Sequence, residues 1–266
     1  MNVASWLKQA KSRIDTLDAE LILLKLLHEN DRSFLVSHDT MELSLNDIDV
    51  LDKLVAYREA KMPLAYVIGE KDFYGRKFDV DRNVLVPRIE SETIIDLSLK
   101  LFHDKKIPSK PKILDVGTGS GCIAVTLSLE IPSADVTAVD ISEDALKVAM
   151  ENNLNLDGKV RFIKSDLLDR VNNEKFDLIV ANLPYVDDNW DFLSPELEWE
   201  PSLALYADNK GLDIIFSLID QVLEYKCTKY LIIECDLCQQ KMLNEYVAKK
   251  GLTIVETSGY QTLIQL

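Results

Sequence analysis

The first sixty residues carry apolar side chains at intervals of three and four positions. The clearest series are Leu17, Leu21, Leu24 and Leu27, and further along Ile48, Leu51, Leu54 and Val55. This spacing is the period of an amphipathic helix. Thr16 and Ser44 precede the two series, where helix N-caps are expected. We therefore predict a small helical domain over residues 1–62, without strands.

Between Pro63 and Pro87 the pattern changes to an alternation that favours β-strands. Its aromatic and β-branched members are Tyr66, Ile68, Phe73, Phe78, Val80, Val84 and Val86. Gly69 and Gly75 supply turn signals between them. We predict a β-hairpin linker over residues 63–89.

From residue 90 onward, short apolar runs alternate with helical patterns. The expected strands are 112–116, 134–140, 160–164, 176–181 and 229–234, with two terminal strands in 252–266. Helical patterns follow the first two strands, and further helices are expected over 91–102, 211–224 and 239–250. Such alternation is typical of α/β proteins with a parallel, doubly wound sheet. We predict one such domain over residues 90–266.

The composition narrows the functional classes. The chain has 266 residues, with 30 Lys and Arg against 45 Asp and Glu, a formal charge of −15. A surface this acidic attracts phosphate backbones poorly, so we expect no tight nucleic-acid binding. The apolar runs are far shorter than the ~20 residues that cross a bilayer. Four cysteines are too few for a secreted disulfide framework. We therefore expect a cytoplasmic protein that does not enter a membrane.

A glycine-rich turn joins the first predicted strand to the following helix. It reads Asp115-Val-Gly117-Thr118-Gly119-Ser120-Gly121. Glycines at alternate positions let a ligand approach the backbone closely at a helix N-terminus. Asp115 would repel a pyrophosphate, whereas it can pair with the ammonium group of a methionine moiety. The turn therefore favours S-adenosylmethionine over a nicotinamide cofactor.

Two further strand ends suit the nucleoside part of such a cofactor. Asp140 ends the second strand, where a carboxylate can accept hydrogen bonds from both ribose hydroxyls. Asp166 and Leu167 follow the third strand, where the adenine ring would lie, and Leu167 would give the ring an apolar contact. We predict that these residues bind the cofactor together with the glycine-rich turn.

The segment Asn182-Leu183-Pro184-Tyr185 directly follows the fourth strand, at the sheet edge where open α/β folds bind their ligands. The side-chain oxygen of Asn182 and the carbonyl of Leu183 can both accept from an NH2 group, while Tyr185 can pack on a planar substrate. Because a sulfonium is a good leaving group, holding the nitrogen in line with the methyl group can supply most of the rate. No strong base is required. The three histidines all lie outside these motifs.

With these motifs in place, the chain resembles the peptide-chain release factor glutamine methyltransferase family over essentially its whole length. Besides the glycine-rich turn and the Asn-Leu-Pro-Tyr segment, the shared stretches are Pro63-Leu-Ala-Tyr-Val-Ile-Gly69-Glu-Lys-Asp-Phe-Tyr74, Val86-Pro87-Arg88 with Glu90 and Glu92, and Glu200-Pro201 with Leu205, Ala207-Asp208 and Gly211. The resemblance implies a Rossmann-like, seven-stranded class I methyltransferase sheet with a helical N-terminal domain. It also implies methylation of the side-chain amide nitrogen (N5) of the glutamine in a release factor's Gly-Gly-Gln motif.

The resemblance also implies roles for particular residues. Residues 117–121, Asp140, Leu167 and Asn182 would contact S-adenosylmethionine, and residues 182–185 would face the substrate together with Arg88. A single glutamine side chain offers too little surface to be told apart from other glutamines, so recognition needs a remote interface. We expect the helical domain to supply it, in a monomer that has release factors as partners.

Two positions depart from the family pattern. Leu183 stands where the family usually has Pro, although the backbone carbonyl that the chemistry needs is retained. Asn-Leu-Pro-Tyr is also similar to the motif of ribosomal RNA adenine dimethyltransferases. After the fifth strand the chain carries Cys235 and Cys238, and one C-x-x-C pair without histidines is a weak metal signal. We expect two inert thiols and no metal.

Two alternatives stay open. One is an adenine-N6 methyltransferase acting on RNA or DNA, which would be expected to carry a basic face beyond the modest 63–89 segment. The other is a binding module that retains the cofactor fold without activity. The presence of Asn182, Pro184 and Tyr185 argues against the second alternative.

Overall fold

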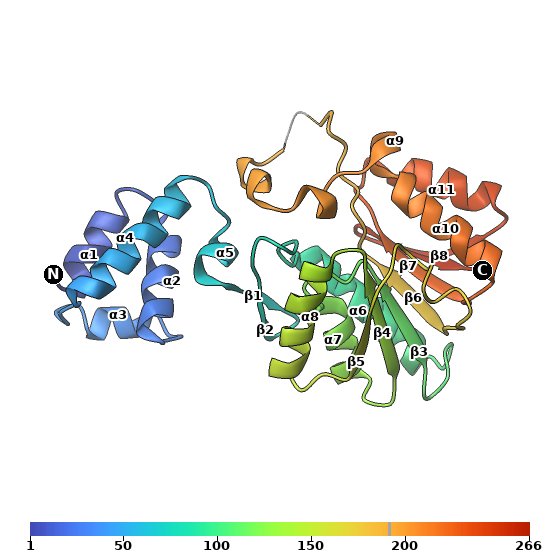
Figure 1. The fold of residues 1–266 in the computed structure, drawn as a ribbon, viewed down its shortest axis with the longest axis horizontal. Helices are drawn as coiled ribbons and strands as arrows, with labels where there is room; N and C mark the ends of the chain where they lie inside the picture. The colour runs from blue at the N-terminus through green and yellow to red at the C-terminus, as the bar shows by residue number, and fades with distance from the viewer. Residues whose placement is uncertain (191–192) are drawn as a thin grey trace. The chain divides into compact units, whose positions relative to one another are not determined.

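A computed structural model describes residues 1–190 and 193–266 of the chain. Their contacts divide them into two compact units (Figure 1). Residues 1–70 and 194–199 form the first unit, and the described residues of 71–193 together with 200–266 form the second.

The first unit is helical, as predicted. It contains α1 (Val3–Ala10), α2 (Thr16–Leu27), α3 (Ser33–Ser37), α4 (Leu45–Glu59), α5 (Leu64–Ile68) and the 3₁₀ helix η2 (Pro195–Trp199). Trp6, Ile22 and Leu51 are among the buried side chains of its core. The helices bury their apolar stripes against one another, which is why the spacing of three and four is visible in the sequence.

The helix N-caps of this unit were predicted with mixed success. Ser44 caps α4 in a reciprocal pair with Asp47, each side chain accepting from the other residue's N–H at 3.1 Å. The prediction of Thr16 as a cap is wrong, because Asp15 caps α2 by accepting from the Leu17 N–H at 2.8 Å. Asp and Thr are both suitable N-cap residues, and here Asp15, one residue before Thr16, is the cap.

The predicted linker divides into two kinds of structure. The hairpin itself comprises β1 (Glu70–Phe73) and β2 (Arg76–Asp79). Residues 64–68, which the alternation placed among strands, instead form α5, and Val67 is buried in the core of the first unit. A helix of five residues is too short to show a helical period, so its apolar run fits either structure. Gly69, at a φ of +78°, is the C-cap at which α5 ends.

The second unit contains a seven-stranded sheet. Its strands are β3 (Lys112–Val116), β4 (Asp135–Asp140), β5 (Val160–Lys164), β6 (Leu178–Ala181), β7 (Tyr230–Glu234), β8 (Thr253–Ser258) and β9 (Gln261–Gln265). Its helices are η1 (Ile89–Ser91), α6 (Glu92–His103), α7 (Cys122–Glu130), α8 (Glu143–Asn155), η3 (Ser202–Ala204), α9 (Asp208–Gly211), α10 (Asp213–Tyr225) and α11 (Gln240–Lys249). All seven predicted strands are present, which confirms the Rossmann-like fold.

The strand order is β5-β4-β3-β6-β7-β9-β8, with β9 antiparallel to both β7 and β8 and the other pairs parallel. From β3 the chain first builds outward through β4 and β5, then returns to place β6 on the other side of β3. In open α/β sheets, such a switch point leaves a crevice at the carboxyl ends of the strands. β3 and β6 flank it here.

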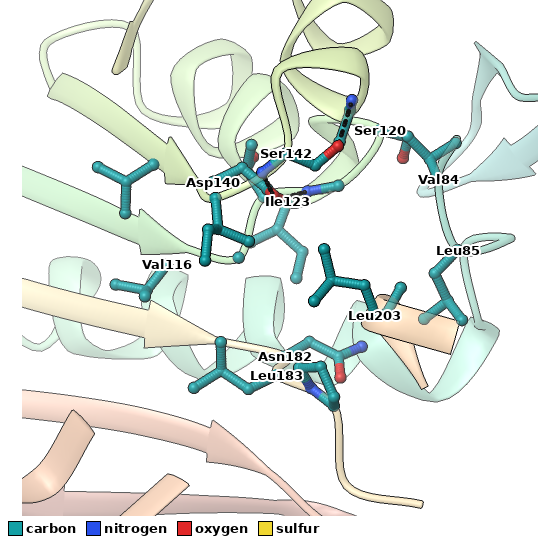
Figure 2. Close-up of a pocket in the computed structure, with 18 of the residues that line it drawn as sticks. Val84, Leu85, Val116, Ser120, Ile123, Asp140, Ser142, Asn182, Leu183 and Leu203 are labelled. Carbon is teal, nitrogen blue, oxygen red and sulfur yellow. Dashed lines mark hydrogen bonds between the residues drawn. The ribbon is translucent and has the colours of Figure 1, made fainter. Parts of the chain in front are cut away.

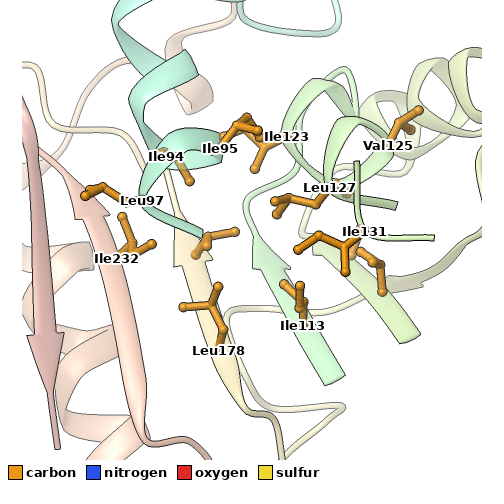
Figure 3. Packing of buried hydrophobic residues seen from close by; sticks show 14 of the residues in the cluster. Ile94, Ile95, Leu97, Ile113, Ile123, Val125, Leu127, Ile131, Leu178 and Ile232 are labelled. Atoms are coloured by element: carbon orange, nitrogen blue, oxygen red, sulfur yellow. The ribbon is translucent and has the colours of Figure 1, made fainter. Parts of the chain in front are cut away.

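Alternate side chains of the strands face two separate cores. On one face, Ile113, Leu178 and Ile232 pack under α6 and α7, as Figure 3 shows. On the other face, Leu114 and Ile179 pack with apolar side chains of α10 and α11. Because both faces are covered, the strands read as continuous apolar runs. Within the described residues, no helix combines the length and apolarity required to span a membrane.

Candidate active site

A cavity of about 520 Å³ lies at the carboxyl ends of β3, β4 and β6. Figure 2 shows Val116, Asp140 and Asn182 at three of its sides, with Leu85 from a loop and Leu203 from η3 opposite the sheet. This volume falls within the usual range of small-molecule sites. The cavity belongs wholly to the second unit.

The glycine-rich turn forms one wall, and its glycines have different tasks. Gly119 has a φ of +54°, and a Cβ added there would meet no atom within 4 Å, so this position leaves room for a ligand. A Cβ on Gly117 would lie 2.8 Å from Cδ2 of Leu183. Gly121 does not line the cavity, because it packs against Ala149 of α8. Of the three glycines, Gly117 and Gly119 therefore line the cavity, and Gly121 does not.

Asp115 is fully buried and does not line the cavity. Its Oδ2 accepts from the hydroxyl of Thr118 at 2.7 Å, and Oδ1 is buried without a hydrogen-bond partner in the described chain. Burial raises the pKa of Asp115 to about 7, although the Thr118 hydrogen bond lowers it. Thr118 and Ser120 do line the cavity. Direct pairing of Asp115 with an ammonium group stays a prediction.

Asp140 lies at the end of β4 and faces the cavity (Figure 2). Its two oxygens accept from the N–H groups of Gly119 and Ser142, both at 2.9 Å. These two bonds fix the carboxylate at the strand end, and each oxygen retains a further lone pair for a ligand hydroxyl. Burial raises the pKa of Asp140, while the two backbone bonds oppose that shift. This geometry suits the ribose role predicted for Asp140.

Asp166 and Leu167 both line the cavity beyond β5. Leu167 has a φ of +42°, a left-handed conformation that is strained for a side chain with a Cβ. Strained backbone of this kind concentrates at ligand-binding sites, where the surrounding structure holds it in place. Both residues therefore line the cavity, and their contact with an adenine ring stays a prediction.

Asn182 follows β6 at the centre of the cavity wall, with Leu183 and Pro184 beside it. Its Nδ2 donates to the hydroxyl of Ser91 at 2.8 Å. This bond fixes the rotation of the amide and leaves Oδ1 as the end that can accept a hydrogen bond. Ser91 was not predicted, because nothing in its neighbourhood distinguishes it from an ordinary helix-start serine.

Tyr185 does not line the cavity, unlike the three residues before it. Its hydroxyl lies 3.3 Å from Oε1 of Glu234, and burial together with that carboxylate raises its pKa. The Tyr185 carbonyl accepts from Nε2 of Gln239 at 2.7 Å, which anchors the end of the segment. Stacking of Tyr185 on a substrate stays a prediction.

Arg88 lines the cavity and forms an ion pair with Glu200, whose side chain is almost completely buried. Glu200 also accepts from the N–H of Val86 at 3.0 Å. The pair therefore fixes the loop that carries Arg88 to a segment more than a hundred residues away. The remaining lining residues include apolar positions to which the sequence analysis gave no role in the site, namely Val84, Leu85, Pro201 and Leu203.

The cysteines lie apart from this cavity except for Cys122. Burial raises the pKa of Cys235 to about 12, and that of the exposed Cys238 to about 11. Such thiols stay protonated near neutral pH and are weak nucleophiles. In the described ranges, no group of three or more His, Cys, Asp or Glu side chains is arranged to hold a metal ion.

The sequence matches two family models, the "PrmC N-terminal domain" over residues 2–69 and the "Methyltransferase small domain" over residues 85–193. The catalytic domain of human hMettl16, solved with a MAT2A 3'UTR hairpin, is similar in fold. Its TM-score is 0.56 at 15% identity, over 88% of this chain and 91% of that one. An identity this low supports the shared fold alone.

Two curated relatives are much closer in sequence, and both are named release factor glutamine methyltransferase. The protein of Koribacter versatilis is 39% identical over 222 residues, covering 82% of this chain and 78% of the relative. That of Fusobacterium nucleatum is 34% identical over 246 residues, covering 90% and 68%. Because these relatives share 34–39% sequence identity with most of the chain, the chain belongs to the release factor glutamine methyltransferase family.

Proposed function

We propose that this protein transfers the methyl group of S-adenosylmethionine to the side-chain amide nitrogen (N5) of the glutamine in the Gly-Gly-Gln motif of peptide-chain release factors. The reaction modifies a factor that acts in translation termination, so we place it in the cytoplasm. Family membership supports the reaction class. The geometry of the cavity supports the roles of individual residues.

The residues at the strand ends fit the cofactor. Asp140 would accept from the ribose hydroxyls, and Gly119 leaves room for the ligand beside it. Asp166 and Leu167 would lie at the adenine ring. The orphaned Oδ1 of Asp115, one residue from the cavity wall, suits a nearby positive group. When bound, the cofactor supplies a methyl group on a sulfonium, which is a good leaving group.

The protein's own contribution to the chemistry is positioning. Oδ1 of Asn182 and the carbonyl of Leu183 would accept from the two N–H groups of the glutamine amide, so that the nitrogen faces the methyl group. Transfer would form a nitrogen–carbon bond at the glutamine, break the carbon–sulfur bond with its electron pair left on sulfur, and release one N–H proton from the nitrogen to solvent water. Holding the reacting atoms in line can supply much of the rate without a strong base.

One observation carries this proposal. The Asn182 amide is held by Ser91 through its nitrogen, so its oxygen is the end offered to a ligand in the cavity. An acceptor at that place matches a substrate that reacts at an NH2 group. The segment that follows is also fixed, since the Val186 N–H donates to the Leu205 carbonyl at 2.8 Å. The acceptor is therefore held in place before substrate binds.

An adenine amino group could donate to the same acceptors as the glutamine amide. The charge around the cavity is therefore what distinguishes a nucleic-acid substrate from a protein substrate. Arg88 is the basic residue of the cavity wall, and its guanidinium is paired with Glu200. With a formal charge of −15 for the whole chain, this leaves little attraction for a phosphate backbone. The charge distribution therefore favours a protein substrate, which we expect a monomer to bind with help from its helical unit.

The test is a competition between substrates. The intact protein is incubated with methyl-labelled S-adenosylmethionine and either a release factor, the same factor with its Gly-Gly-Gln glutamine replaced by alanine, or total RNA. We expect label in the unaltered release factor alone. Label in RNA would favour the adenine methyltransferase, and label in the alanine form would place the acceptor elsewhere on the factor.

A further inference from the structure

The turn that follows β5 places a strained residue at the wall of the cavity. Leu167 has a φ of +42°, and it lines the cavity together with Asp166. A residue with a Cβ adopts this left-handed conformation rarely, and keeps it only where the surrounding structure holds it. The contacts on either side of Leu167 therefore decide where its side chain lies.

Two hydrogen bonds tie this turn to other elements, one before Leu167 and one after it. The N–H of Ser165 donates to the carbonyl of Asp140, at the end of β4, at 2.9 Å. The N–H of Leu168 donates to Oε1 of Gln221, on α10, also at 2.9 Å. The side chain of Leu168 is itself buried in the core of the second unit. Leu167 therefore lies between an anchor on β4 and an anchor on α10.

Gln221 belongs to the face of α10 that lines the cavity. Ile214, Ser217 and Gln221 all line it, at the spacing of three and four that brings helical residues onto one face. Ile215 and Leu218, on the neighbouring face, are buried in the core. Packing of this second face holds the helix in place, so that Gln221 starts from a fixed backbone.

The orientation of the Gln221 amide follows from its partner. A backbone N–H can only donate, so the amide oxygen must face Leu168. Nε2 then points to the other side, where it lies 3.5 Å from Oδ1 of Asp169. The acceptor that holds the turn is therefore supplied by a side chain more than fifty positions further along the chain.

We propose that Gln221 is a positioning residue for the cofactor, which holds Leu167 in its left-handed conformation at the place where the adenine ring binds. This inference rests on the proposed function, because the ring belongs to S-adenosylmethionine. It assigns a task to the helix α10, which carries no residue of the predicted site.

The physical reason is that a strained turn relaxes when one of its anchors is removed. Without an acceptor on α10, Leu167 can move to a conformation with negative φ, and its side chain then leaves the wall of the cavity. The cofactor would bind only the fraction of molecules in which the turn is formed, so its apparent affinity falls by that fraction. Once the cofactor is bound the turn is formed again, and the acceptors at Asn182 and Leu183 are unaltered.

The test measures cofactor affinity and turnover in the full-length protein. Gln221→Met keeps the length of the side chain but removes the amide oxygen. We expect calorimetry to show about tenfold weaker binding of S-adenosylmethionine, which corresponds to about 1.4 kcal/mol and is the order of one hydrogen bond. The kcat with a release factor and saturating cofactor should stay the same. Gln265→Met, at an exposed position of β9, is the control and should keep both values. Unchanged affinity in Gln221→Met would overturn the proposal.

A second variant restores the acceptor without restoring the glutamine. Gln221→Glu supplies an oxygen for the Leu168 N–H but brings a carboxylate close to Asp169, so it is combined with Asp169→Asn. The double variant exchanges amide and carboxylate and leaves the net charge as it was. We expect it to recover most of the affinity that Gln221→Met loses. Binding as weak as in Gln221→Met would overturn the role of the acceptor.

A double-mutant cycle with Leu167→Gly separates an action through Leu167 from a direct contact with the cofactor. Glycine adopts a positive φ without strain, so the turn depends less on its anchor. Gln221→Met should therefore lower the affinity less in the Leu167→Gly protein than in the intact one. Equal losses in the two backgrounds would overturn the action through Leu167.

A measurement without cofactor keeps this inference distinct from the proposed function. Hydrogen exchange, followed by mass spectrometry in peptides that cover residues 165–171, should be faster in Gln221→Met than in the intact protein and unchanged in Gln265→Met. Equal exchange in Gln221→Met and the intact protein would overturn the anchoring of the turn. A protein that binds S-adenosylmethionine but does not methylate a release factor would instead overturn the proposed function alone.

Discussion

Gly117 and Leu183 approach each other so closely that a Cβ on the glycine would lie 2.8 Å from Cδ2 of the leucine. The side chain of Leu183 is buried against the glycine-rich turn. The glycine-rich turn and the segment 182–185 are therefore packed together through these two residues. A substitution at Gly117 should therefore displace Leu183 and alter the position of its backbone carbonyl.

We first predict that Gly117→Ala destabilises the fold modestly and slows methyl transfer strongly. The φ of +73° strains any residue with a Cβ, and the added methyl must displace the Leu183 side chain. Gly251→Ala is the matched control, since Gly251 has a φ of +75° and open space around it. Chemical unfolding should show a loss of stability in both variants, the larger one in Gly117→Ala, and turnover should fall only in Gly117→Ala. Equal turnover in the two variants would refute the coupling.

The second prediction concerns the acceptor. Asn182→Ala should reduce methyl transfer by orders of magnitude, because the substrate NH2 loses the oxygen that orients it. Cofactor affinity, measured by calorimetry, should fall much less. An active alanine variant would remove Asn182 from the mechanism.

The third prediction concerns the ribose. Asp140→Ala should raise the KM for S-adenosylmethionine about tenfold to a hundredfold, since a hydrogen bond to a charged partner contributes about 1.5–3 kcal/mol. Asp144→Ala, at the exposed start of α8, serves as control and should leave this KM unchanged. If the KM also stays constant in Asp140→Ala, the ribose is bound elsewhere.

The fourth prediction is a pH dependence of stability. The pKa of Asp115 is raised to about 7 in the folded protein from an ordinary 3.8, so the folded state holds this proton more tightly than the unfolded chain does. Its contribution is therefore fully present below about pH 4 and is lost as the pH rises through 7. Asp115→Asn should gain stability relative to the intact protein between pH 5 and pH 8. Urea unfolding without cofactor measures this, and exposed Asp135→Asn should show no such trend.

The fifth prediction concerns the helical unit. Removing residues 1–69 should leave a folded domain that binds S-adenosylmethionine, because the second unit has its own two cores and contains the whole cavity. Methylation of a release factor should become inefficient, since remote binding energy helps to align the amide. A folded truncation with undiminished kcat/KM would show that the helical unit is not needed for recognition.

Some features followed from the sequence because they depend on local patterns. The strand Lys112–Val116 was predicted with its exact bounds, since a buried parallel strand is apolar on both faces. Asp140 and Asn182 were placed at one sheet edge because parallel strands end on the same side. The helix α5 was missed, because five residues are too few for a helical period to be recognised.

What the sequence determined by itself was the fold and the position of the glycine-rich turn and of residues 182–185 at one edge of the sheet, because each is encoded in a run of neighbouring residues. Tertiary structure alone decided that Tyr185 points away from the cavity and that Ser91 holds Asn182 across 91 positions of sequence. It also decided that Arg88 is neutralised by Glu200, 112 positions away. Hydrogen bonds between distant residues depend on how the elements pack, and no local spacing records that.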